Sequence, residues 1–224
     1  MQGEKTKESY LPTYTKGEEI FNMVSHVVGA AFGIAALVLC VVMAAVHQNV
    51  WGVVSGAIFG AAMIILYTMS SIYHGLRNRR AKLVFRVFDH CSIFLLIAGT
   101  YTPLTLCTLH GALGWVLFGV VWAAAVVGIV LNSVSVERFR KFSMACYICM
   151  GWVVILALKP LLDRLEFAGF LFLLAGGVFY TIGAVLYGVG KRKKYIHSVW
   201  HLFVLGGSVT HFFAILLYVM PVRP

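Results

Sequence analysis

The chain has 224 residues, of which 61% are hydrophobic and only 12% are charged. A soluble domain carries about 25% charged residues, so this composition excludes a single small soluble core. It predicts an all-α integral membrane protein whose apolar surface faces lipid. The net charge of +10 does not indicate nucleic-acid binding, because the basic residues lie in short clusters between apolar runs, as membrane topology signals do.

Seven apolar runs follow one another along the chain, each close to the roughly 20 residues that cross a bilayer as a helix. We predict seven spanning helices at residues 21–46, 50–74, 84–108, 111–134, 142–161, 167–189 and 196–220. A short polar segment, residues 1–19, precedes them, and we expect no cleavable signal peptide. The connections are short, so residues 20–220 are expected to form one membrane domain.

The basic residues predict the orientation of this seven-transmembrane helix bundle. Fifteen of the 18 Lys and Arg residues lie in the N-terminal segment and in the second, fourth and sixth connections, and three lie on the other side. Because positive residues favour the cytoplasmic side, the N-terminus is predicted to be cytoplasmic and the C-terminus outside. The expected location is the inner (cytoplasmic) membrane, as a multi-pass protein.

Four ionisable residues inside these runs are candidates for a functional site, since such groups are costly within a membrane. His74 ends the second run, Asp89 lies at the start of the third, and His197 and His201 lie at the start of the seventh. The predicted topology places these run ends on the cytoplasmic side. We therefore expect the four side chains to share one depth, just inside the inner surface.

Three histidines in this layer predict a zinc site. His197 and His201 are four residues apart and project from one helix face, and His74 adds a third nitrogen, which leaves one position of a tetrahedral Zn²⁺ for water. Asp89 is then either the general base for that water or a fourth ligand. Ser70, one turn before His74, is a candidate to hold the water or to donate to an oxyanion. The alternative interpretation is a proton relay or a hydrogen-bonded polar cluster.

Further polar residues lie near this layer. His26 follows Asn22 by one turn at the start of the first run, which places it beside the expected site. His211 lies about 15 Å deeper than His201 at the rise of a helix, so it cannot share the ion. Together with Ser208, it predicts either an internal cavity that extends from the site or a helix–helix hydrogen bond.

Four stretches of the chain carry a family resemblance, and they are GEEIFNMVSH (17–26), SSIYH leading to FDH (70–90), AGTYTP (98–103) and HSVWHLFVLGGSVTHF (197–212). In this order and with seven predicted helices, they resemble the hemolysin III family, the bacterial branch of the progestin and adipoQ receptor superfamily. The resemblance extends over nearly the whole chain. The long N-terminal domain of the eukaryotic receptors has no counterpart in it, so hormone binding is not expected.

The resemblance implies a site and a chemistry. Adiponectin receptors of this superfamily have seven helices, a cytoplasmic N-terminus and a zinc ion near the cytoplasmic face. The resemblance therefore implies that His74, His197 and His201 are zinc ligands, with Asp89 near the zinc water and Ser70 beside it. Alkaline ceramidases are similar to these receptors and hydrolyse a lipid amide. Bacterial members are named after lytic activity, and some are linked to membrane energetics or lipid composition.

Two functions follow from these observations. The first is a zinc-dependent hydrolase that acts on a lipid-like amide or ester. The second is a non-enzymatic protein, either a cytolytic pore or a sensor of membrane state, in which zinc has a structural role. The expected partner is membrane lipid, as substrate or ligand. Neither a protein partner nor nucleic acid is predicted, and the sequence leaves the oligomeric state open.

Overall fold

The computed structural model describes residues 11–189 and 193–223, and the elements of this part of the chain are helical. Its α-helices are α1 (Lys16–Val46), α2 (Val50–Gly75), α3 (Arg79–Pro103), α4 (Ala112–Trp152), α5 (Leu158–Arg164), α6 (Phe167–Val189) and α7 (Ile196–Tyr218). A π-helical turn (Leu104–Thr108) and a 3-10 turn (Val153–Ala157) extend α3 and α4. Four of the basic residues that are predicted to lie on the cytoplasmic side are outside the described residues, namely Lys5, Lys7, Lys191 and Arg192.

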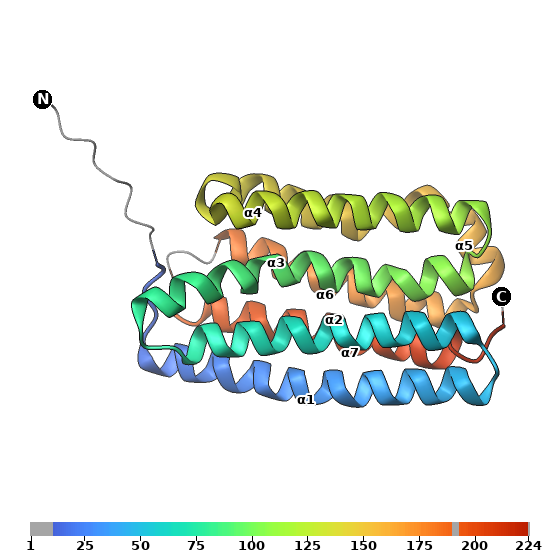
Figure 1. Cartoon of the computed structure of the whole chain (residues 1–224), viewed down its shortest axis with the longest axis horizontal. Helices are drawn as coiled ribbons and strands as arrows, with labels where there is room; N and C mark the ends of the chain where they lie inside the picture. The colour runs from blue at the N-terminus through green and yellow to red at the C-terminus, as the bar shows by residue number, and fades with distance from the viewer. Residues whose placement is uncertain (1–10, 190–192, 224) are drawn as a thin grey trace, which may run out of the picture.

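The long helices form a bundle in which α1 packs on α2, α2 on α3, α3 on α4 and α6 on α7. They run along one common direction, with α7 also against α1 (Figure 1). Large aliphatic side chains point out of this bundle, such as Val116 at 62% and Leu156 at 80% exposure, whereas Ala36 and Ser55 are fully buried. Such an apolar outer surface suits lipid. Within the described residues, six helical segments are long and apolar enough to cross a membrane, which confirms the prediction of a helical membrane protein.

The fourth and fifth predicted runs fall within one helical segment, residues 112–164, that doubles back on itself. A straight helix of this length would extend about 80 Å. Instead, Ser135 adopts an extended conformation (φ −167°, ψ 108°) that interrupts α4. The guanidinium of Arg164 donates a hydrogen bond to the carbonyl of Leu109 over 2.5 Å, so the segment ends next to where it begins. Figure 1 shows α5 at the end of the bundle where α4 starts.

Helices α1 and α2 approach each other through two Gly-x-x-x-Gly sequences, at residues 29–33 and 56–60. Small residues at this spacing allow membrane helices to pack closely, which van der Waals contact then stabilises. A Cβ atom added at Gly60 would lie only 2.4 Å from Cβ of Leu37 and 2.5 Å from its Cα. The glycine is therefore required by the close approach of the two backbones.

We expect Gly60→Leu to destabilise the protein by about 1–3 kcal/mol, because the larger side chain overpacks the α1–α2 contact. Gly119→Leu is the matched control, since a Cβ atom at Gly119 meets nothing within 4 Å. Both substitutions replace a helical glycine by leucine, so the effect of losing glycine's backbone freedom is the same in the two variants. Thermal unfolding of the purified proteins in detergent measures the difference, and equal midpoints for the two variants would contradict this packing.

Candidate metal centre

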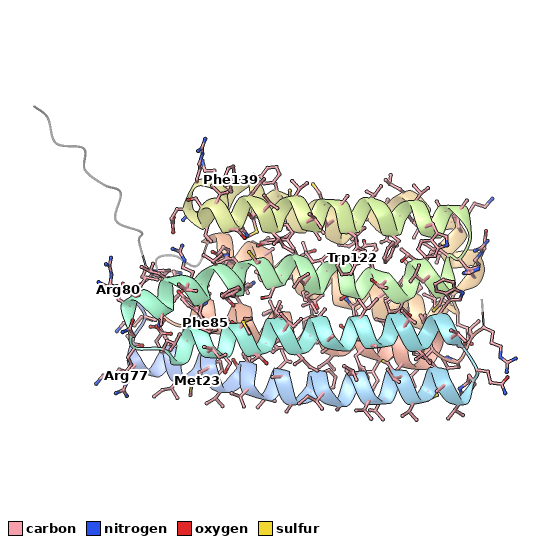
Figure 2. The ribbon with its side chains drawn as sticks, in the orientation of Figure 1. Met23, Arg77, Arg80, Phe85, Trp122 and Phe139 are labelled. Carbon is pink, nitrogen blue, oxygen red and sulfur yellow. The ribbon has the colours of Figure 1, made fainter. Side chains whose placement is uncertain are left out.

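The ends of several helices meet at one end of the bundle. The start of α1, the connection from α2 to α3 and the start of α7 lie together there, at the left of Figure 1. Arg77 and Arg80 project from the same end, where Met23 of α1 also lies (Figure 2). Segments far apart in the sequence thus bring their polar residues to one place.

The three histidines that the sequence singled out converge at this end. One ring nitrogen from each of His74, His197 and His201 lies within 4.8 Å of the others. The Nε2 atoms of His197 and His201 are 3.0 Å apart. A tetrahedral zinc ion with Zn–N bonds of about 2.0–2.1 Å holds its ligand nitrogens about 3.3 Å apart. The spacing of His197 and His201 is therefore close to what a single ion requires, and His74 lies within 4.8 Å of both.

Unpaired polar atoms show that these residues fit a metal ion. Nine buried side-chain N and O atoms in the described part of the chain lack a hydrogen-bond partner, and eight of them belong to Asn22, His26, Ser70, His74, Ser198 and His201. Each such atom costs about 1–3 kcal/mol when it is left unsatisfied. Two of these atoms, Nε2 of His74 and Nδ1 of His201, belong to the three-histidine cluster, so a buried lone pair is available there for an ion. Imidazole ligands suit zinc, copper, iron or nickel.

His26 lies beside the three-histidine cluster, as its position in the sequence predicts. Its ring centroid is 3.9 Å from that of His201, and its ring meets Tyr67 edge to face at 5.0 Å. Both ring nitrogens of His26 are buried, and neither has a hydrogen-bond partner among the described residues. This imidazole adds a further polar group next to the cluster without belonging to the set of three ligand nitrogens.

Two residues that the sequence analysis did not single out complete the site. Glu19 accepts a hydrogen bond from Nδ1 of His74 over 2.7 Å. Tyr14 stacks on His197, with ring centroids 4.8 Å apart and an interplanar angle of 21°. Burial raises the pKa of the Tyr14 phenol above its ordinary value, so the hydroxyl keeps its proton at neutral pH. Tyr14 therefore covers the histidines with a neutral aromatic ring.

The local structure at the start of α1 positions both residues. Thr15 is the N-cap, and it forms a capping box with Glu18, in which each side chain binds the other residue's backbone N–H. Oε1 of Glu18 also accepts a hydrogen bond from the backbone N–H of Tyr195, which has a left-handed conformation (φ 63°). This hydrogen bond links the first turn of α1 to the start of α7, the helix that carries His197 and His201.

A sequence signal for Glu19 was present. Glu19 precedes Asn22 by three residues and His26 by seven, so all three lie on one face of a helix. Asn22 and His26 are buried, at 0% and 2% exposure. A polar stripe that leads from Glu19 into the membrane could have indicated that this carboxylate faces the site.

The structure places Asp89 and Ser70 in the protein interior near this end. Asp89 is 8% exposed and lines a cavity of about 390 Å³, whose wall also includes His26. Its carboxylate is not part of the cluster of three ligand nitrogens. Ser70 is 1% exposed, and its hydroxyl has no partner among the described side chains and backbone groups. Both groups are therefore available for hydrogen bonds to a ligand or water.

The cavity has mostly apolar walls and follows the length of the bundle. It extends from Arg140, near the histidine end, to Leu161 and Phe170, near the opposite end, and most of its lining residues come from α3, α4, α6 and α7. His211 lines it at an intermediate depth and also donates a hydrogen bond from Nε2 to the carbonyl of Leu173 over 3.1 Å. The sequence predicted either an internal cavity or a helix–helix hydrogen bond at His211, and the structure has both.

A multi-pass helical membrane protein with a largely buried three-histidine cluster at one end of its bundle is the class that this fold and site define. The family model described as haemolysin-III related matches residues 14–212. The chain belongs to the hemolysin III family, within the progestin and adipoQ receptor superfamily. The family recognised from its motifs is therefore confirmed.

Sequence similarity to three relatives agrees with this family assignment. Hemolysin-3 of Bacillus cereus is 43% identical over 204 residues, which cover 91% of this chain and 93% of the relative. The hemolysin-3 homolog of Bacillus subtilis (strain 168) is 41% identical over 209 residues, 93% of this chain and 98% of the relative. Heptahelical transmembrane protein ADIPOR2 of Oryza sativa subsp. japonica is 30% identical over 158 residues, 62% of this chain and 69% of the relative.

Proposed function

We propose that the chain crosses the inner membrane seven times, with its N-terminus in the cytoplasm and its C-terminus outside. The interruption at Ser135 supports dividing residues 112–164 into two spans. Arg77 and Arg80 at the histidine end of the bundle support a cytoplasmic position for that end (Figure 2). The rice relative is itself named heptahelical.

Reporter fusions to the full-length chain test this topology. A phosphatase that is active only after export should be active when it is fused to the C-terminus, and a fluorescent protein that matures only in the cytoplasm should be dark there. At the N-terminus the fluorescent protein should be bright, because the basic residues hold that side in the cytoplasm. The opposite pattern at either end would contradict the proposed orientation.

We also propose that the three-histidine centre binds zinc and that the protein hydrolyses a lipid-like amide or ester. The observation that carries this proposal is the position of the cluster, because His201 packs against His26, which lines a long apolar cavity with Asp89 in its wall. A cavity of this size and apolarity suits a hydrocarbon chain. The substrate would then be a membrane lipid, with its polar bond near the histidines.

Each polar residue has a role in this reaction. His74, His197 and His201 would hold the zinc ion, which supplies a water of lowered pKa and polarises a carbonyl group when it is bound. Asp89 would accept the proton of the attacking water and return it to the leaving amine or alcohol. The hydroxyl of Ser70 would donate a hydrogen bond to the substrate carbonyl oxygen, on which negative charge develops. The cavity walls would hold the acyl chain and exclude bulk water.

A lipid panel tests the hydrolase directly. Full-length, zinc-loaded protein in detergent should release fatty acid from at least one class among ceramides, other N-acyl amines and glycerolipid esters. Release should stop when zinc is removed by a chelator and return when zinc is added, since the ion supplies the reactive water. No release from any lipid by protein that is shown to contain zinc would contradict the proposal.

A second candidate is a non-enzymatic cytolytic or membrane-sensing protein with structural zinc. The observation that favours it is the name of the two Bacillus relatives, hemolysin-3. Zinc-loaded protein would then release a trapped dye from vesicles of pure phospholipid without cleaving the lipid. Dye release that requires lipid cleavage would instead assign any lytic effect to hydrolysis.

A further inference from the structure

One carboxylate on α1 joins three helices beside the metal centre. Oε2 of Glu19 accepts a hydrogen bond from Nδ1 of His74 over 2.7 Å, and Oε1 accepts one from Nζ of Lys82. The side chain of His74 is 0% exposed, and those of Glu19 and Lys82 are 20% and 12% exposed. The contact between Glu19 and His74 is thus largely shielded from water, where charge-assisted hydrogen bonds are strong.

This contact decides which nitrogen of His74 faces the other histidines. An ionised carboxylate can only accept, so Nδ1 of His74 must carry the proton. In a neutral imidazole, Nε2 then has a free lone pair. Nε2 of His74 is buried and has no hydrogen-bond partner among the described residues, so this lone pair is available to a metal ion. The ring cannot turn over without breaking its bond to Glu19.

We propose that Glu19 is a positioning residue that sets the metal affinity of the centre by holding His74 in its Nδ1–H tautomer. The inference rests on the proposed metal centre but not on the hydrolase reaction. A residue that binds the far nitrogen of a metal-bound histidine typically changes metal affinity about 10- to 100-fold. Lys82 supports this role, because it fixes the second oxygen of the same carboxylate.

Glu166 offers a matched control, because it is an exposed glutamate in the connection between α5 and α6, at the end of the bundle opposite the histidines. Glu18 does not serve this purpose, because its capping box with Thr15 and its hydrogen bond from the backbone N–H of Tyr195 position the first turn of α1. A general effect of losing one negative charge would appear equally in Glu19→Gln and Glu166→Gln.

The test is the dissociation constant of zinc, measured on full-length protein in detergent by competition with a chelator. We expect Glu19→Gln to weaken zinc binding about 10- to 100-fold and Glu166→Gln to leave it near the wild-type value. The amide of Gln can donate to Nδ1 of His74, which favours the tautomer whose Nε2 carries the proton and cannot bind metal.

A double-mutant cycle distinguishes positioning from a general structural role. If Glu19 acts through His74, Glu19→Gln should have no further effect on zinc affinity in the His74→Ala background. An equal loss in both backgrounds, or an unchanged affinity in Glu19→Gln alone, would overturn the inference while the metal centre stands. A wild-type protein that binds no zinc would overturn the metal centre and this inference together.

Discussion

Purified protein that carries His197→Ala/His201→Ala should contain no zinc, whereas the wild type should contain about one ion per chain. The double change removes two of the three converging nitrogens and leaves His74 alone. A change beside a ligand already costs about 10- to 100-fold in affinity, and the loss of two ligands costs more than that. Elemental analysis of protein that was prepared without chelator measures the result.

The control removes two imidazoles from the other end of the bundle. His47 and His110 lie in connections there, and each makes a hydrogen bond to a backbone carbonyl of the preceding turn. His47→Ala/His110→Ala should therefore keep the wild-type zinc content. Equal zinc loss in both double variants would indicate a damaged fold. A wild type without metal would contradict the centre and leave the histidines a proton-relay or packing role.

The helices could be predicted closely from the sequence, because lipid makes the length and apolarity of a segment decisive. The run at 167–189 coincides with α6, and the run at 50–74 differs from α2 by one residue. Helix ends differ where polar residues continue a helix beyond the apolar run. Thus α1 begins at Lys16, five residues before its run, because the capping box of Thr15 and Glu18 starts the helix there.

The histidine cluster could be predicted because two independent constraints agree. The spacing of His197 and His201 puts them on one helix face, and the charge pattern puts His74 at the same depth. Tyr14 lacked such constraints, and Glu19 had a single one, its position on the same helix face as Asn22 and His26. Glu19 contacts a histidine 55 residues further along the chain, and no periodicity links the two. In a polar terminal segment, its carboxylate resembled an ordinary solvated charge, and only the capped first turn of α1 brings it inward.

Asp89→Asn should lower kcat for lipid hydrolysis about 10²- to 10⁴-fold, the usual contribution of a general base, while the zinc content stays unchanged. The amide has nearly the same shape as the carboxylate but cannot take a proton from the attacking water. Asp89 is 8% exposed and lines the cavity next to the histidine end, so bulk water cannot readily replace it. Fatty-acid release at saturating substrate measures the effect.

Asp163→Asn is the control for Asp89, because Asp163 is an exposed carboxylate on α5, at the opposite end of the bundle. It should leave both turnover and zinc content unchanged. Full turnover in Asp89→Asn would contradict the role of Asp89 as a base. Loss of zinc together with turnover would instead make Asp89 a fourth ligand. Since the carboxylate lies outside the cluster of three ligand nitrogens, we expect turnover to fall while the three histidines keep the ion.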